Sequence, residues 1–572
     1  MTTLAHNLIR SAGEVPRRTA ITLIEGESTL PLTYEELLAG ASGYARALAE
    51  AGVRPGEVVV ILLEHGRHLV ESFLGAILQG AVPSIMPFLT EKLSPERYQA
   101  SLRSLIQITD PAALVTYEAF GERARSAAES SRVRRVLLDH QVARGPSGGI
   151  HELAAGDRAA DDVVLLQHSS GTTGLQKGVA LSHRAVLKQC RDYAEAIRLQ
   201  SDDVVVSWLP LYHDMGLIAG FLLPLIRRVP LVLMSPFEWV RAPVRLLQAI
   251  DRHRGTLAWL PNFAYNFCAQ KIRETDLEGL DLTSWRSVIN CSEPMRWRSH
   301  QMFLDRFRPY GFRAEALATC YAMAENVFAV TQGGMDGPVV VDEIDLGALT
   351  SDGEARPAAS GQGFRMLSAG RPIADTEVRI LDSQRRLLPD RRLGDIALRS
   401  QCMLTGYYNR PDLTAEAFHE GWYLTGDLGY TAHGELYITG RRKELIIVGG
   451  KNVYPQDIEE LAGDVPGVHA GRVAAFGIFN DDLGTEEIVV VAESDSQDSH
   501  ESRWIADSIK VNVARGSDVV VRHVRIVPPR WLIKTSSGKL ARQANRQKYL
   551  EESMDKTGAT SMAGAGREGK DA

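Results

Sequence analysis

The sequence predicts an α/β protein in which a large N-terminal unit with largely parallel sheets precedes a smaller α+β unit. Three observations support this prediction. A chain of 572 residues is too long for one compact core, so two or more domains are expected. Short apolar runs rich in β-branched residues alternate with segments of helical period, as in parallel sheets covered by helices. Past about residue 440 the pattern changes, because a basic run precedes a short strand and two glycines.

Apolar patterning predicts the elements of the N-terminal unit, which we place at residues 1–439. The predicted helices are Thr33–Ala51, with Thr33 and Glu36 as a capping box, His68–Gln79 and Val244–Arg254. The predicted strands are Val58–Leu63, Asp162–Gln167, Val204–Trp208, Pro230–Met234 and Ser287–Asn290.

The second unit is placed at residues 440–550. It is expected to begin with the strand Leu445–Val448 and a helix that starts within Pro455–Leu461. The last stretch, Glu551–Ala572, has almost nothing to bury, so a disordered tail is expected there.

Charge and composition argue against several classes of protein. The net charge of −7 leaves no excess of Lys and Arg to displace counterions from a nucleic acid. The five cysteines are scattered without CxxC spacing, which argues against a disulfide framework or a zinc cluster. The N-terminus lacks the apolar run of a signal peptide, and the apolar stretch Gly216–Ile226 is too short to span a membrane. We therefore expect a cytoplasmic protein without a transmembrane segment or a nucleic-acid partner.

A loop rich in glycine and hydroxyl residues, Ser169–Gly178, follows the predicted strand Asp162–Gln167. Its glycines let backbone N–H groups turn toward an anion, its hydroxyls add donors, and Lys177 adds positive charge. It differs from a Walker A loop, in which Ser or Thr follows the lysine, because Gly178 stands there. A flexible surface turn is the alternative, but ten specified positions after a strand favour phosphate binding.

This loop resembles the nucleotide-phosphate motif of the ANL superfamily, which comprises acyl-CoA synthetases, nonribosomal adenylation domains and luciferases. Further motifs agree in order from about Thr33 to Arg542, which is nearly the whole chain. The resemblance implies the ANL fold, with a large AMP-binding domain, a small mobile C-terminal domain and ATP as a substrate. It implies that ATP phosphates contact Ser169, Ser170, Gly171, Thr172, Thr173, Gly174 and Lys177, with Thr172 also catalytic.

Three further motifs resemble the nucleotide site of the family. The segment Tyr321-Ala322-Met323-Ala324-Glu325 resembles Tyr-Gly-x-Thr/Ala-Glu, although Ala322 replaces the usual glycine. This implies that the Tyr321 ring stacks on adenine and that the Glu325 carboxylate holds the Mg²⁺ that bridges the ATP phosphates. Ser292-Glu293-Pro294 resembles the segment that lines adenine. Asp427 and Arg441 resemble the pair that binds ribose.

Other motifs resemble the catalytic and moving parts of the family. The segment Trp208–Gly216 implies that His213 lies between the acyl pocket and the reacting carboxylate. The segment Lys534–Lys539 implies that Lys539 reaches the adenylation site, where a fixed ammonium offsets the repulsion between a carboxylate and ATP. The resemblance also implies a hinge at Lys443 and a tunnel for the thiol lined by Gly449, Gly450 and Lys451.

The expected reaction activates a hydrophobic carboxylic acid as acyl-AMP, releases pyrophosphate and passes the acyl group to the phosphopantetheine thiol of CoA or an acyl carrier protein. Aromatic residues at this density also occur in plain cores, but they suit such an acid; they are Trp208, Trp259, Phe263, Tyr265 and Phe267.

The acceptor is left open by conflicting resemblances. The segments Ser207–Ile218, Pro261–Tyr265 and Lys451–Glu459 resemble fatty-acyl-AMP ligases, and the long connection Glu325–Gly370 resembles the insertion by which those enzymes hinder CoA. Gly449-Gly450-Lys451 instead departs toward CoA ligases. Acyl-AMP formation with a partner for the second step, or a luciferase-like oxygenase, are the alternative hypotheses, and the wrong lysine context disfavours a P-loop NTPase.

Overall fold

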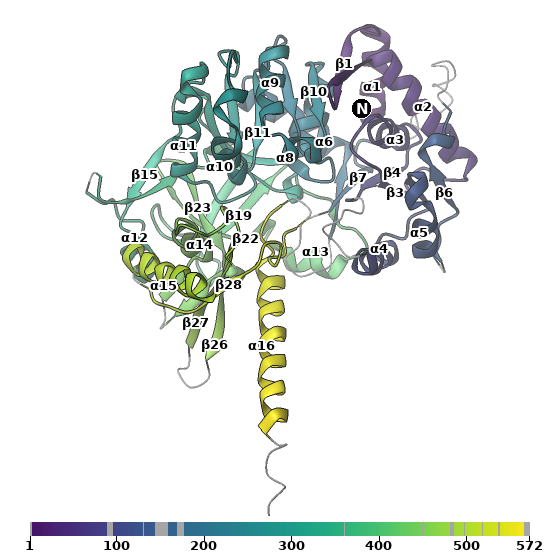
Figure 1. The fold of residues 1–572 in the computed structure, drawn as a ribbon. Helices are drawn as coiled ribbons and strands as arrows, with labels where there is room; N and C mark the ends of the chain where they lie inside the picture. Colours follow the sequence, from purple (N-terminus) through teal and green to yellow (C-terminus); the bar gives the residue numbers. More distant parts are fainter. Residues whose placement is uncertain are drawn as a thin grey trace, which may run out of the picture.

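The computed structural model describes residues 3–87, 95–129, 131–143, 158–168, 177–359, 361–448, 451–480, 485–496, 498–517, 519–535 and 538–564. Two large sheets and the helices around them form the N-terminal domain, and a small α+β domain follows (Figure 1). The predicted fold class is confirmed. Among the described residues, no helix is long and apolar enough to cross a lipid bilayer.

The first sheet has nine strands, of which six neighbours in its centre run parallel. In spatial order its strands are β17 (Arg371–Pro372), β14 (Ala329–Gly333), β13 (Leu317–Ala322), β12 (Ser287–Asn290), β11 (Leu257–Leu260), β9 (Val205–Ser207), β10 (Leu231–Met234), β1 (Thr19–Glu25) and β2 (Ser28–Thr33). The outer strands pair antiparallel. The carboxyl ends of the parallel strands therefore meet at one edge, where ligands bind in open α/β sheets.

The second sheet has seven strands and is parallel from β7 to β6. Its order is β20 (Gly406–Tyr407), β8 (Gly178–Ser182), β7 (Val163–His168), β4 (Val82–Ile85), β3 (Val58–Leu62), β5 (Ala113–Thr116) and β6 (Arg135–Leu138). The short strand β20 pairs antiparallel with β8, which follows the glycine-rich loop, and so brings a segment from far along the chain beside that loop.

Helices cover these sheets, and one continuous hydrophobic core joins side chains of both sheets and the helices between them. The helices are α1 (Leu4–Glu14), α2 (Tyr34–Glu50), α3 (Arg67–Leu78), α4 (Pro95–Thr109), α5 (Glu118–Ala128), α6 (His183–Ala196), α7 (Leu223–Arg227), α8 (Pro236–Arg241), α9 (Val244–His253), α10 (Asn262–Lys271) and α11 (Trp297–Phe307). The capping box predicted for α2 is present, because Thr33 Oγ1 accepts from the Glu36 N–H and Glu36 accepts from the Thr33 N–H.

The elements predicted from apolar patterning agree with those of the structure. Each predicted strand and helix of the N-terminal unit occurs within about two residues of its expected bounds. The apolar stretch Gly216–Ile226 is, as expected, a mostly buried core segment, formed by the π-helical turn η4 (Met215–Leu222) and α7.

A third sheet leads from the N-terminal domain to the C-terminal domain. It contains β18 (Thr376–Leu381), β19 (Gly394–Ser400), β22 (Trp422–Ala432), β21 (Phe418–His419) and β23 (Glu435–Arg441), with α13 (Pro411–Ala417) before β21. The long connection after Glu325 builds a small unit of its own, with β15 (Val341–Ile344), α12 (Leu346–Asp352) and β16 (Phe364–Leu367). A satellite cluster that includes Ile344 and Tyr430 packs this unit onto β22.

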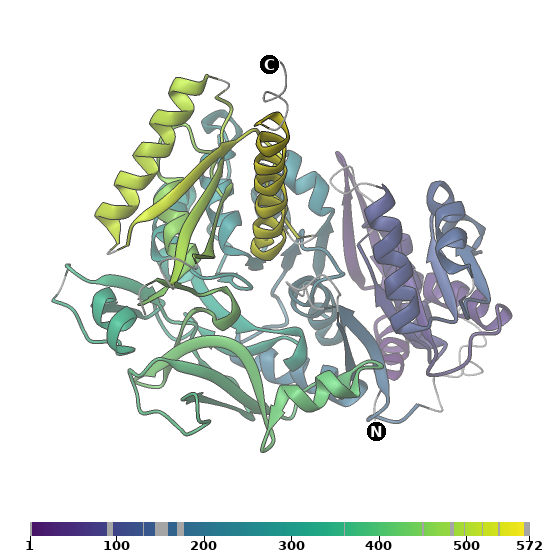
Figure 2. The ribbon, with the colours of Figure 1, turned by 90° about the horizontal axis from the view of Figure 1, so that it is seen from below.

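The C-terminal domain has a three-stranded sheet, β26 (Val473–Asn480), β27 (Thr485–Glu493) and β28 (Val521–Val527). It begins with the hairpin β24 (Ile446–Val448) and β25 (Lys451–Val453), and its helices are α14 (Pro455–Gly463), α15 (Ser499–Gly516) and α16 (Arg542–Gly564). Figures 1 and 2 show this domain on one side of the N-terminal domain, with α16 projecting away from it.

The expectation of a disordered tail over Glu551–Ala572 is wrong for its first part, because α16 continues through Gly564. Its residues before Gly564 are mostly good helix formers, and its first turns are held by packing of Tyr549 on Phe476 and by the ion pair between Arg525 and Glu552. Residues 565–572 lie outside the described part of the chain.

Candidate active site

Four of the motifs follow the carboxyl ends of parallel strands, as the sheet topology requires of a ligand site. The loop Ser169–Gly178 follows β7, and Trp208 follows β9. Ser292-Glu293-Pro294 follows β12, and Glu325 follows β13. Since β9, β12 and β13 belong to one sheet, their loops lie along the same edge.

Asp427 and Arg441 lie opposite each other on the neighbouring strands β22 and β23. Arg441 Nε donates to Asp427 Oδ1 at 3.1 Å, and the Tyr321 hydroxyl donates to Asp427 Oδ2 at 2.5 Å. The Asp427 carboxylate raises the pKa of Arg441 further above its already high value. The three side chains, which are far apart in sequence, therefore form one hydrogen-bonded group with a fixed carboxylate at its centre.

Glu325 lies in the short 3₁₀ turn η8 (Ala324–Asn326) and accepts a hydrogen bond that the sequence analysis missed. The Tyr407 hydroxyl is 2.9 Å from Glu325 Oε1 and 3.0 Å from the Tyr423 hydroxyl. Lys177 Nζ lies 4.6 Å from the centre of the Tyr407 ring, within the range of a cation–π contact. Tyr407 on β20 thus joins the end of the phosphate loop to the carboxylate of Glu325.

Replacing Tyr407 with phenylalanine tests this contact, because it keeps the ring under Lys177 and removes the hydroxyl. A hydrogen bond to a charged group contributes about 1.5–3 kcal/mol, so we expect roughly a 10-fold or greater loss in kcat/KM for pyrophosphate release and a higher Mg²⁺ requirement. Tyr423→Phe is the matched control, since Tyr423 bonds to Tyr407 and not to Glu325 in the described residues. Equal losses in both variants would contradict the role of the Glu325 contact.

Two positions of backbone strain lie beside these motifs. Ser292 has a φ of 72°, in the left-handed region that non-glycine residues avoid. Val327, two residues after Glu325, has a φ of 62° and a ψ of −53°, and the Phe328 N–H donates to the Asn326 carbonyl at 2.6 Å. This is a γ-turn, which is strained for a β-branched residue. Such strain persists only where the surrounding packing holds the backbone in place, which is common at functional sites.

His213 and Asp214 form the third part of the site, after the turn that follows β9. His213 Nδ1 lies 2.6 Å from Asp214 Oδ1, at an angle outside hydrogen-bond geometry. Burial by itself would raise the pKa of Asp214, but the nearby His213 and Lys539 outweigh it and lower that pKa. Asp214 therefore stays charged in a buried position beside Lys539.

Lys539 reaches this site from the C-terminal domain. Its turn is held by the Thr535 N–H, which donates to the Lys539 carbonyl at 2.7 Å, and by the Lys539 N–H, which donates to Thr535 Oγ1 at 3.1 Å. Burial lowers the pKa of Lys539 and the Arg441 charge lowers it further, while Glu293 and Asp214 act in the opposite direction. The charges that act on Lys539 thus come from the loops after β9 and β12, which carry Asp214 and Glu293, and from the end of β23, where Arg441 lies.

The lowered pKa of Lys539 predicts a pH effect. A lysine with a lowered pKa loses its proton at a lower pH than a free lysine, whose pKa is about 10.4. If the ammonium form is the active one, the alkaline fall in kcat/KM for pyrophosphate release should therefore begin below that value. Lys539→Arg should shift this alkaline limb to higher pH, because arginine stays charged. An unchanged alkaline limb in the arginine variant would show that another group titrates.

The remaining predicted residues fall into three groups. Residues 169–176 and 449–450 lie outside the described part of the chain, so the predictions for Ser169, Ser170, Gly171, Thr172, Thr173, Gly174, Gly449 and Gly450 stay predictions. Lys443 lies in the short turn η9 (Arg442–Glu444) directly after β23, and Lys451 begins β25. Of the aromatic residues, Trp259 and Tyr265 are fully buried core residues that bond to Tyr193 and to the Val288 carbonyl.

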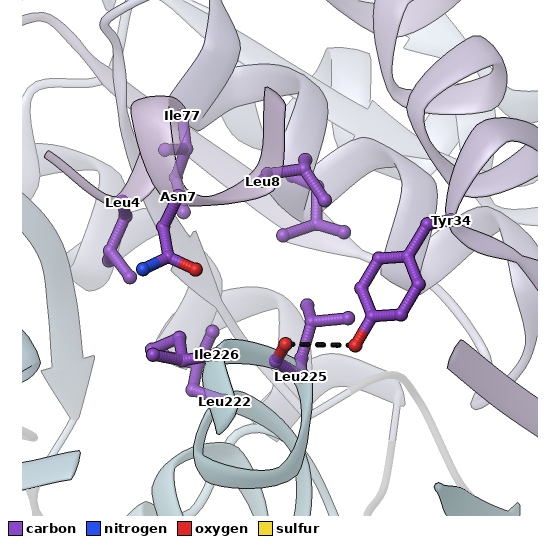
Figure 3. Close-up of a pocket in the computed structure, with 9 residues that line it drawn as sticks. Leu4, Asn7, Leu8, Tyr34, Ile77, Leu222, Leu225 and Ile226 are labelled. Carbon is purple, nitrogen blue, oxygen red and sulfur yellow. Dashed lines mark hydrogen bonds between the residues drawn. The ribbon is translucent and has the colours of Figure 1, made fainter. Parts of the chain in front are cut away.

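Glu325 is chemically suited to Mg²⁺, which proteins bind through one or two carboxylates together with substrate phosphates. Within the described ranges no group of three or more His, Cys, Asp or Glu side chains could hold a metal by itself. A narrow apolar crevice between α1, α3 and α7 is lined by residues such as Leu8, Ile77 and Leu222 (Figure 3). It contains none of the motif residues, and Tyr34 closes one side of it by donating to the Leu225 carbonyl at 3.0 Å.

Fold and site together define an adenylate-forming enzyme, with a large α/β domain and a small C-terminal domain. The chain belongs to the AMP-binding enzyme family, which it matches over residues 8–408. It is related to fatty-acyl-AMP ligases and acyl-CoA synthetases, and enzymes of this kind adenylate carboxylic acids.

Two relatives and one solved structure illustrate this relation. The chain is 31% identical to the medium-chain-fatty-acid–[acyl-carrier-protein] ligase JamA of Moorena producens, over 97% of each chain. It is 30% identical to the long-chain-fatty-acid–AMP ligase FadD26 of Mycobacterium marinum, over 97% of this chain and 98% of the relative. A structure from studies of fatty acyl-adenylate ligases of E. coli and L. pneumophila superposes with a TM-score of 0.87 at 27% identity, over 97% of this chain and 98% of that one.

Proposed function

We propose that the protein activates a hydrophobic carboxylic acid with ATP as acyl-AMP and passes the acyl group to the phosphopantetheine thiol of an acyl carrier protein. The observation that carries the adenylation step is the position of Lys539. A Cβ placed on its neighbour Gly538 would lie 3.8 Å from the Phe263 ring, and the Phe263 N–H donates to Glu293. The charges of Asp214, Glu293 and Arg441 act on Lys539, and Arg441 in turn pairs with Asp427. One site therefore combines a fixed cation with the residues expected to hold the nucleotide.

The chemistry assigned to each residue follows from charge. A carboxylate attacking the α-phosphate approaches a polyanion, and the Lys539 ammonium reduces that repulsion and stabilises the charge of the transition state. Asp427 accepts from the ribose hydroxyls, and hydrogen bonds from Arg441 and Tyr321 hold that carboxylate in place. Mg²⁺ held by Glu325 and the phosphates would neutralise charge on the leaving pyrophosphate. Positioning and electrostatics supply the catalysis, since no side chain forms a covalent bond.

The preference for a carrier protein over CoA as acceptor rests on the small unit of β15, α12 and β16 that follows Glu325. Its helix α12 packs against β25, the strand of the C-terminal domain that begins at Lys451. Arg296, directly before α11, forms ion pairs with Asp457 at 2.6 Å and with Glu460 at 3.3 Å, both on α14. These contacts hold the C-terminal domain against the N-terminal domain in the present arrangement. A thiol that brings binding energy of its own, as a docked carrier protein does, is better able to displace them than free CoA.

Acid-dependent release of pyrophosphate, followed by thioester formation, tests both halves of this proposal. We expect release with hydrophobic acids and faster thioester formation with a holo-acyl carrier protein than with CoA. Release of pyrophosphate without formation of a thioester would support the adenylation step and contradict the transfer step. Oxygen consumption with light emission would favour a luciferase-like oxygenase instead.

A further inference from the structure

An aromatic cluster of Trp208, Trp239, Phe263 and Phe267 lies next to the proposed acid site. Trp208 follows β9, Trp239 is on α8, and the two phenylalanines are on α10, one turn apart. Of these four residues, Trp208 and the two phenylalanines were expected near the acid from the sequence. Trp239 joins them through tertiary packing alone.

The two indoles form the closed centre of the cluster. Their ring centres are 3.6 Å apart and their planes differ by 8°, so nothing fits between them. Phe263 packs edge-on against both, at 6.4 Å from Trp208 and 6.1 Å from Trp239, and Phe267 lies 5.4 Å from Trp239. Trp239 is 0% and Trp208 is 4% exposed, so both rings are buried away from solvent.

Phe263 connects this cluster to the reacting end of the site. Its backbone N–H donates to Glu293 Oε2 at 2.9 Å, and Glu293 is a charge neighbour of Lys539. A Cβ placed on Gly538 would lie 3.8 Å from the ring of Phe263, so this ring packs directly below the turn that carries Lys539. Trp208 also precedes the His213–Asp214 pair by only a few residues. Phe263 therefore lies between the turn that carries Lys539 and the stacked indoles.

We propose that Trp208 and Trp239 form the floor of the acyl pocket and limit the acid to a compact one, a short or medium straight chain or a single aryl group. This inference rests on the proposed function, because it presumes that the acid is held at Lys539. A long chain would have to displace a stacked pair of buried indoles, and rearranging a close-packed aromatic cluster is costly. Trp239, on α8, is thus assigned as the residue that determines chain length.

The experiment compares wild type and Trp239→Ala for pyrophosphate release across straight-chain acids from butanoate to hexadecanoate. We expect the kcat/KM of the wild type to peak among the shorter acids and to fall steeply for dodecanoate and longer ones. Opening the floor should raise the ratio of kcat/KM for the longer acids to that for the shorter acids by at least about 10-fold, the effect of one methylene group in a closed apolar pocket. Trp239→Leu, which fills more of the space, should give an intermediate shift and guards against misfolding of the alanine variant.

Trp285→Phe is the matched control. Trp285 is an equally buried indole that packs on Phe303 and Phe312, away from the cluster, so this variant should lose some stability without a change in chain-length preference. Wild-type activity on hexadecanoate equal to that on hexanoate, or an unchanged profile in both Trp239 variants, would overturn the inference alone. Absence of pyrophosphate release with every acid would instead overturn the proposed function on which it rests.

Discussion

Lys539→Ala is expected to reduce acid-dependent pyrophosphate release about 10²–10³-fold, the loss typical of removing one preorganised group that stabilises developing charge. The ammonium is the cation that the C-terminal domain adds to a site already containing Asp214, Glu293 and Arg441. Without the ammonium, the carboxylates of Asp214 and Glu293 repel the carboxylate of the incoming acid more strongly. Burst measurements of pyrophosphate, with ATP and acid saturating, give the rate of this half-reaction directly.

The same variant separates the two half-reactions. Transfer from a supplied acyl-adenylate to the carrier thiol does not require attack on ATP, so Lys539→Ala should retain most of it. Lys548→Ala provides a control for loss of a lysine in the same domain, because Lys548 Nζ donates to the Trp531 carbonyl at 2.7 Å. Equal loss of both half-reactions in Lys539→Ala would contradict a role confined to adenylation.

Arg542→Ala should destabilise the C-terminal domain by about 3 kcal/mol, at the lower end of the range for breaking a buried ion pair because some solvent reaches the group. Arg542 donates to both oxygens of Glu459, at 2.7 Å each, and also pairs with Glu444. Burial would lower the pKa of Arg542, but the two carboxylates outweigh it and raise that pKa. The alanine variant leaves both carboxylates without this partner.

Hydrogen exchange of the C-terminal domain measures this effect independently of activity. We expect faster exchange in α14 and in the hairpin of β24 and β25, the elements beside Glu459 and Glu444, while the nine-stranded sheet stays protected. Arg515→Ala, at the exposed end of α15, should leave exchange unchanged. Protection in the Arg542 variant equal to that of Arg515→Ala would show that the two ion pairs contribute little.

Local pattern in the sequence was sufficient for the elements and for most of the proposed site. The period of apolar residues predicted β3, β7, β9, β10, β12 and α2 because each buries one face or both faces against the core. The motifs that resemble the family predicted Glu325, Asp427, Arg441 and Lys539, and of these Glu325 follows a parallel strand, whose carboxyl end lies at the ligand edge of the sheet. The composition of Glu551–Ala572 led to the wrong prediction of a disordered tail, because this stretch has little apolar surface to bury. Its composition does not show that α16 is held by contacts of Tyr549 and Glu552.

By itself, the sequence determined that this protein is an α/β adenylate-forming enzyme with Lys539 in a second, smaller domain. Only the tertiary structure decided which side chains surround each motif residue. It placed Tyr407 between Lys177 and Glu325, Trp239 on Trp208, and Arg542 between Glu444 and Glu459. The physical reason is that these contacts join residues from distant parts of the chain through packing and charge. Such contacts produce no periodic pattern in the sequence around either residue.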